Sequence, residues 1–174
     1  MLAVMVLALV LIVFFAGRVF GSSDEPDPKP TAEPTSEETK TPSPDESCDP
    51  KNISIALNAG PNSIESGEDA AFDIAVTNNG SDACTIDLGD KSRVLTITSG
   101  SDRIWSSQDC ATEEEASRLV LLRPGSANVA TVVWDGQRSD KQCTSDLPSP
   151  RSGTYKLEIK MKDVDVVEHR FNIT

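Results

Sequence analysis

The sequence has few of the side chains from which metal and catalytic sites are built. Its 174 residues include a single histidine, His169, and four cysteines, none of them in a C-x-x-C pair. Zinc sites bring paired ligands at short spacing, so no metal site is expected. No G-x-S-x-G motif or other setting for a nucleophile is present, and a catalytic triad needs a nucleophile beside its histidine. We therefore expect no enzyme activity and no cofactor.

Basic residues are also scarce. The chain has 16 lysines and arginines against 28 acidic residues, a formal net charge of -12, and no basic run. A surface of this sign repels phosphates, so nucleic acid is excluded as an expected partner. The glutamates at 113–115 and the aspartates Asp87 and Asp90 carry the oxygen atoms that a hard cation takes, but they lack EF-hand spacing. Solvated loops are the better interpretation.

A long apolar run occurs once. Residues 1–17 contain no charged or polar side chain, and with Val19 and Phe20 the run reaches roughly 30 Å as a helix, about one bilayer core. No lysine or arginine precedes it, whereas signal peptides usually begin with a positive region. We predict a single-pass plasma-membrane anchor over residues 1–20, with a cleaved signal peptide as the alternative.

Residues 21–47 are rich in proline and acidic residues and have no apolar periodicity. Such a segment cannot bury enough apolar surface to offset the entropy of ordering, so we predict a disordered linker. Fully extended, it would reach on the order of 80 Å. It serves either as a stalk that lifts a domain from the membrane or as a neutral spacer.

The four cysteines predict two disulfides. An even number behind a membrane-targeting segment is typical of an oxidising compartment, so we expect residues 48–174 to lie outside the cytoplasm. Arg18 alone, on the flank of the apolar run, weakly favours the opposite orientation. Three pairings are open for four cysteines. Their positions relative to the expected strands favour two of the pairs, Cys48–Cys84 and Cys110–Cys143.

Residues 48–174 alternate apolar and polar residues in short runs separated by turn signals. We predict strands within 53–57, 71–78, 84–88, 93–99, 102–105, 118–122, 127–134, 153–162 and 166–174. The segment 153–162 alternates most regularly, with Tyr155, Leu157, Ile159 and Met161 inward, and the segment 118–122 places Leu119 and Leu121 together before a Pro-Gly turn. Residues 109–120 hold one helical turn at most. This pattern predicts an all-β fold, an immunoglobulin-like antiparallel β-sandwich.

The two tryptophans stand in similar surroundings. Trp105 and Trp134 each begin a polar stretch that ends in a cysteine, Cys110 and Cys143 respectively. Periodicity alone does not place either indole. They pack in the core or against the disulfide, or else they form a binding surface together with Asp109.

Four stretches resemble the family of the intracellular proteinase inhibitor BsuPI. They are "FDIAVTNNG", "VLTITSGSDRIWSS", "LVLLRPGSANVATVVWDG" and "SGTYKLEIKM", which lie within residues 71–162. The resemblance implies an immunoglobulin-like sandwich and, more weakly, proteinase inhibition. With its apolar leader and four cysteines, the chain resembles a membrane-anchored, extracytoplasmic version of that family, as expected of a Gram-positive actinobacterium.

We therefore expect a non-enzymatic, membrane-tethered binding or scaffold domain of the cell envelope. Its N-terminal helix would associate with the membrane, and its loops near Cys110 and Cys143 would bind an envelope protein or a wall component. The alternative is a proteinase inhibitor acting outside the cytoplasm on a protease partner. For that function, the segment 106–117 is the expected inhibitory loop.

Overall fold

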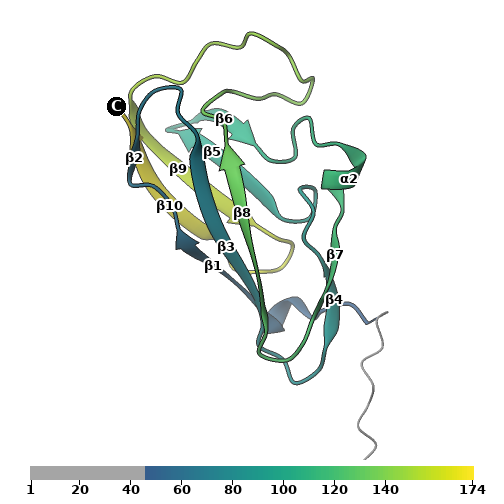
Figure 1. Ribbon diagram of the computed structural model, residues 1–174. Coiled ribbons are helices and arrows are strands. Elements are labelled where there is room, and N and C mark those ends of the chain that lie inside the picture. The colour runs from purple at the N-terminus through teal and green to yellow at the C-terminus, as the bar shows by residue number, and fades with distance from the viewer. Residues whose placement is uncertain (1–45) are drawn as a thin grey trace, which may run out of the picture. The chain divides into compact units, whose positions relative to one another are not determined.

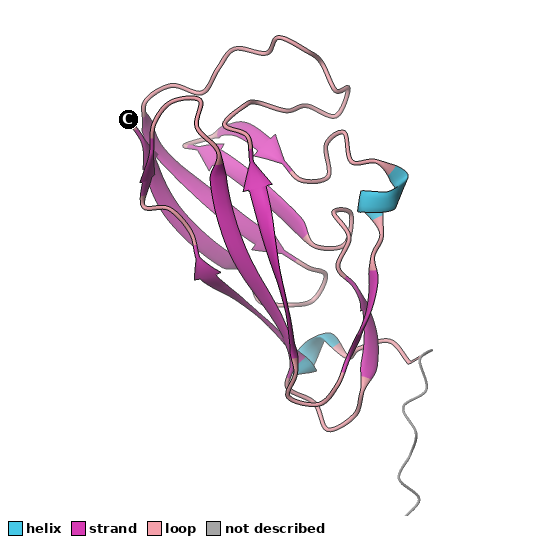
Figure 2. Ribbon diagram, in the orientation of Figure 1, coloured by secondary structure: helices cyan, strands magenta, loops and turns pink. Residues whose placement is uncertain are grey.

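The computed structural model describes residues 46–174, which form a β-sandwich (Figures 1 and 2). In chain order its elements are η1 (Pro50–Asn52), β1 (Ile53–Ala59), β2 (Ser63–Ile64), β3 (Ala70–Asn78), β4 (Cys84–Asp87), β5 (Val94–Ser99), β6 (Asp102–Ser106), α2 (Glu113–Ala116), β7 (Leu119–Leu122), β8 (Ala127–Trp134), β9 (Gly153–Lys160) and β10 (Val167–Ile173). The predicted anchor at 1–20 and the predicted linker as far as residue 45 lie outside the described residues. Within 46–174, no helix has the length and apolar character needed to cross a membrane.

The strands form three sheets. Their orders are β1-β3-β8, β2-β10-β9-β5-β6 and β4-β7. All neighbouring strands are antiparallel except β2, which runs parallel to β10. The predicted all-β sandwich is confirmed, with a mixed rather than purely antiparallel larger sheet because the two-residue β2 pairs with the C-terminal strand.

The main core lies between the two larger sheets. Phe72 and Trp134 come from one sheet, and Leu157 and Phe171 come from the other; all four are almost completely buried. Alternation along β9 buries Tyr155, Leu157 and Ile159 as the sequence predicts. Each large apolar side chain removed from water in this way contributes about 1.5–3 kcal/mol. Residues 46–174 therefore contain a core of their own, as a domain that folds independently needs.

One strand faces the opposite way from the sequence prediction. On β7, Leu119 is 72% exposed and Leu121 is 45% exposed, whereas Leu122 is 2% exposed. Leu122 packs with Ile53 and Val76 in a second apolar cluster. The four consecutive apolar residues of β7 contain no alternation, so tertiary packing decides which face is buried. Met161 also differs from expectation: it lies beyond the end of β9 and packs against this second cluster.

The two residues just before the expected boundary at Cys48 already pair with the sandwich. Ser47 forms a parallel bridge with Thr85 of β4, and the Glu46 carbonyl accepts a hydrogen bond from the Thr85 N–H at 2.7 Å. The following residue, Cys48, is bonded to Cys84, the first residue of β4. The start of the domain is thus joined to β4 by backbone pairing and by a covalent bond.

An ion-pair cluster on the outer face of β9 is expected to make the stability of the domain depend on pH. Lys156 and Lys160 donate to the Glu158 carboxylate at 2.8 and 2.7 Å, and these hydrogen bonds lower the pKa of Glu158 from 4.5 to about 2. A carboxyl whose pKa is lower in the folded state stabilises the fold above its unfolded pKa, and this contribution is lost as the pH falls from about 4.5 to 2. We expect Glu158→Gln to be less stable than the wild type at pH 7 and by a smaller margin at pH 2.5, measured by urea unfolding. An unchanged difference between the two pH values would contradict the assignment.

Candidate binding site beside the Cys110–Cys143 disulfide

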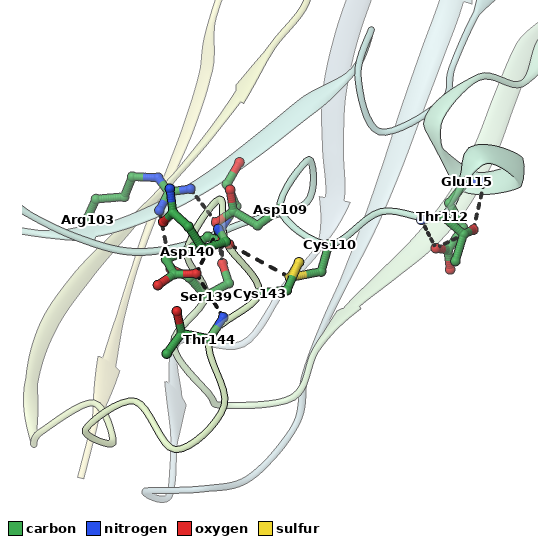
Figure 3. The surroundings of a disulfide bond; sticks show 11 residues. Arg103, Asp109, Cys110, Thr112, Glu115, Ser139, Asp140, Cys143 and Thr144 are labelled. Atoms are coloured by element: carbon green, nitrogen blue, oxygen red, sulfur yellow. Dashed lines mark hydrogen bonds and ion pairs between the residues drawn. A yellow bond between two sulfur atoms is a disulfide. The ribbon is translucent and has the colours of Figure 1, made fainter.

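The second disulfide joins two loops that are far apart in the sequence. Cys110 lies in the loop after β6, and Cys143 lies in the long loop between β8 and β9, with their Cα atoms 5.4 Å apart (Figure 3). Together with Cys48–Cys84, this is the pairing that the sequence favours. The two disulfides support placement of the domain outside the cytoplasm. Both Cys110 and Cys143 have left-handed backbones, with φ of 56° and 55°, so each stands at a sharp change of chain direction.

A buried polar network holds the same two loops together. The Asp109 carboxylate accepts from the Arg103 guanidinium and from the Ser139 hydroxyl, the latter at 2.6 Å (Figure 3). The Ser139 oxygen in turn accepts from the N–H of Ser106 at 3.0 Å, and the Ser139 N–H donates to the Ile104 carbonyl at 3.0 Å. The Asp109 side chain is fully buried and serves the packing of the loops, and the residue also belongs to the lining of the hollow described below.

The role of Asp109 can be tested by its removal. We expect Asp109→Ala to lower the free energy of unfolding by about 3 kcal/mol, because Arg103 and Ser139 lose their common acceptor. The measurement is chemical unfolding of residues 46–174. Asp165→Ala, at an exposed aspartate in the turn before β10, is the control and should differ from the wild type by less than about 0.5 kcal/mol. Equal effects of the two substitutions would show that the network contributes no stability.

The Cys143 loop is also shaped by an exposed carboxylate. Asp140 accepts hydrogen bonds from the backbone N–H groups of Gln142 and Thr144, both at 3.0 Å. The bond from the Thr144 backbone is the largest of the contributions that hold the pKa of Asp140 below its ordinary value. The turn that presents Cys143 is therefore built around an ionised aspartate.

The two tryptophans have different roles. Trp134 is completely buried; its Nε1 donates to the Gln137 carbonyl at 2.7 Å, and its ring lies 6.1 Å from that of Phe171. It is a core residue, so the hypothesis that it contributes to a binding surface is wrong. Trp105 is only partly buried: it packs against the edge of the main core and also lines a surface hollow.

That hollow lies beside β8 and measures about 470 Å³. Residues 130–133 of β8 form one side of it, and Cys110, Glu115 and Arg118 belong to the other, where α2 and the start of β7 lie across from β8 (Figure 1). The Trp105 ring and the Arg93 side chain also line the hollow. It is therefore a preformed depression with an aromatic and a cationic side chain.

Arg93 is the unexpected member of this site. The residue is 4% exposed, and its Nε and Nη1 atoms have no hydrogen-bond partner among residues 46–174. Burial, followed by the nearby charge of Arg118, lowers its pKa, and Asp90 acts in the opposite direction. Sequence reasoning missed Arg93 because it stands as one charged residue before the apolar strand β5, where an exposed position is the ordinary expectation. A second hollow, of about 950 Å³, lies near Cys48 and Met161, but its Lys91 and Lys162 are exposed to solvent.

The segment 106–117 is folded back on itself. Ser106 and Ser107 are buried, and Thr112 begins the helical turn α2 through a capping box with Glu115. The prediction of at most one helical turn in this region is confirmed. An extended, exposed stretch that fits a protease cleft is therefore missing from these twelve residues. For this reason we expect residues 46–174 at micromolar concentration to leave trypsin-like and subtilisin-like proteases active; inhibition of either would contradict this expectation and support the alternative of a proteinase inhibitor.

The remaining polar candidates have structural roles. His169 is partly buried, stacks on Phe171 and places its Nε2 2.8 Å from the Pro61 carbonyl. Asp87 accepts from the backbone of Gly89 and Arg118, at 2.8 and 2.7 Å. Residues 46–174 contain no group of three histidine, cysteine or acidic side chains arranged to hold a metal ion.

The fold and its bridges define the class of this protein, a two-disulfide β-sandwich domain. No family model and no curated protein matches it. A β-glucosidase from Listeria innocua has a TM-score of 0.48 at 12% identity over 70% of this chain and 16% of its own. A cycloisomaltooligosaccharide glucanotransferase from Paenibacillus sp. has a TM-score of 0.47 at 15% identity over 70% of this chain and 14% of its own. An alkylpurine DNA glycosylase from Pseudomonas fluorescens has a TM-score of 0.44 at 9% identity over 70% of this chain and 30% of its own. The chain thus spans less than a third of each of these proteins, and no function follows from such likenesses.

Proposed function

We propose that this chain is a non-enzymatic, membrane-tethered binding or scaffold domain of the cell envelope, with an immunoglobulin-like sandwich held outside the cytoplasm. The hollow beside β8 supports this function most directly. Trp105 and Arg93 both line this surface depression, and Arg93 has donors that residues 46–174 leave unpaired. Aromatic and arginine side chains that line a hollow are typical anchors of protein interfaces.

The proposed location follows from the cysteines and the N-terminal sequence. Both disulfides of the domain suit an oxidising compartment. We propose that residues 1–20 anchor the chain in the plasma membrane as a single span and that the linker holds the sandwich at a distance from it. The partner in this arrangement is an envelope protein or a wall component within reach of the linker.

The function is tested by photo-cross-linking in the native membrane. A photoreactive phenylalanine derivative replaces Trp105 in the full chain, and the control carries it at Val166, which is 49% exposed and outside the hollow. We expect a discrete covalent adduct from position 105 and none from position 166. The absence of an adduct, or the same adducts from both positions, would contradict a binding role for the hollow.

A further inference from the structure

The outer edge of β8 is an unpaired strand edge. In the described part of the chain, β3 is the only strand hydrogen-bonded to β8. The eight residues of β8, Ala127–Trp134, include no charged residue and no proline, and their register with β3 has no irregularity. A strand of this kind is a template for a further strand, because its edge carries a row of backbone donors and acceptors.

The other edges of the two larger sheets carry features that discourage pairing. β6 presents Asp102 and Arg103 and has a broken register with β5. β1 is irregular between Leu57 and Ala59, and β2 has only two residues. Charges, bulges and short length are the means by which natural sheets avoid edge-to-edge association. β8 has none of these features.

The hydrogen-bond pattern shows which groups of β8 point outward. Asn78 donates its N–H to the Ser126 carbonyl at 3.0 Å, one step beyond the β3–β8 ladder. Because bonded and non-bonded pairs alternate along antiparallel strands, the even-numbered residues of β8 bond to β3. Val129, Thr131 and Val133 therefore direct their N–H and C=O groups away from β3, into the open edge. Their neighbours Ala130 and Val132 turn their side chains to the inner face of the sheet.

The hollow beside this edge is bounded on its far side. Cys110, Glu115 and Arg118 limit it on the side opposite β8, so a whole second sheet would meet α2 and the start of β7. The formal net charge of -12 further opposes association of two copies. A polysaccharide would not supply donors and acceptors at strand spacing. The geometry therefore favours a peptide over a second copy or a wall glycan.

The charges in the hollow select one kind of side chain. The charged residues that line the hollow are two arginines, Arg93 and Arg118, and three acids, Asp90, Asp109 and Glu115. The Asp109 carboxylate is engaged by Arg103 and Ser139. Glu115 is already engaged by Thr112, and Arg118 donates to Asn128 at 3.3 Å. The Arg93 guanidinium is left without a hydrogen-bond partner on two of its nitrogens. Since a buried unpaired donor is unfavourable and a carboxylate is the strongest acceptor for a guanidinium, a carboxylate is the complementary group.

We propose that the outer edge of β8 binds an extended peptide segment of the partner as an added strand, and that Arg93 receives an aspartate or glutamate side chain of that segment. This inference rests on the proposed function and names its chemistry. The backbone of the segment pairs with Val129, Thr131 and Val133, as in other cases of strand addition. Side chains on one face of the segment point toward Trp105 and Arg93. Those on the other face lie across from Val129 and Val133, which are 57% and 54% exposed, and β-branched residues suit these positions.

The test begins with a displayed library of random ten-residue peptides, selected on immobilised residues 46–174. We expect the selected peptides to share one acidic residue among β-branched residues. Their binding should fall at least tenfold in Val129→Pro, because proline removes an outward N–H without affecting the β3 ladder. In Arg93→Met, a selected peptide and its glutamine-for-glutamate version should bind equally. The control, Val166→Lys, should bind as the wild type does.

A second measurement needs no variant. In the free domain, the amide protons of Val129, Thr131 and Val133 should exchange rapidly with solvent, whereas those of Asn128 and Val132 should be protected by β3. A selected peptide should slow exchange at the first three positions. Failure of the library to yield any binder, full binding to Val129→Pro, or unchanged exchange at β8 would each overturn the proposal. If any of these results occurs while the position 105 adduct still forms, the binding domain stands and only strand addition is refuted.

Discussion

Trp134→Ala should lower the free energy of unfolding of residues 46–174 by about 3–5 kcal/mol, whereas Trp105→Ala should lower it by only about 1 kcal/mol. Trp134 is completely buried against Tyr155 and Phe171, so truncation removes its dispersion contacts and leaves a cavity between the sheets. Its indole N–H also loses the bond to the Gln137 carbonyl. Trp105 packs only against the margin of the core, and water can enter the hollow that it leaves.

Urea unfolding followed by circular dichroism measures both effects, since each variant retains one tryptophan and fluorescence would compare unlike probes. Trp134→Phe is the matched control, because it retains an aromatic ring and should recover a large part of the loss. The two tryptophans begin similar sequence stretches, so comparable losses for the two alanine variants would contradict the roles assigned to them. A large loss at Trp105 would also weaken its assignment to a binding surface.

Removal of either disulfide should lower the free energy of unfolding by roughly 3–4 kcal/mol, with nearly equal effects for the two. The sequence separations are 36 for Cys48–Cys84 and 33 for Cys110–Cys143, and the entropy lost by the unfolded chain depends only on the logarithm of loop length. The paired serine variants of each bridge should therefore have similar unfolding midpoints.

The measurement is urea unfolding of each paired variant beside the wild type, and peptide mapping of the non-reduced wild type verifies the pairing. A difference of more than about 1 kcal/mol between the two variants would show that one bridge acts mainly on the folded state. Cross-pairing of Cys48 or Cys84 with Cys110 or Cys143 in the peptide map would contradict the structure itself.

Alternation was sufficient to predict the strands that have one buried face. β9 is the clearest case, because Tyr155, Leu157 and Ile159 alternate with charged residues that need solvent. It failed at β7, where four apolar residues in succession leave the choice of face to packing, and at Met161, where β9 ends one residue earlier. Local pattern carries no information in either place.

The candidate site was predicted less completely. The cysteine positions relative to the strands favoured the observed pairing, and the disulfide region was the expected location. Trp134 and Asp109 were placed at the surface as one of two alternatives because a tryptophan and an aspartate in a polar stretch have no periodicity to mark burial. The burial of Arg93 and the open edge of β8 could not be predicted, because both depend on which strands become neighbours. Only the tertiary fold determines those neighbours.

The bond between Cys48 and Cys84 also determines how the domain carries mechanical load. Tension on the chain before residue 46 reaches Cys48 and divides there between β1, which follows in sequence, and β4, which is reached through the sulfur atoms. A pull of this kind cannot peel β1 from β3 one hydrogen bond at a time unless β4 yields as well. The domain therefore resists being unzipped from its N-terminal end.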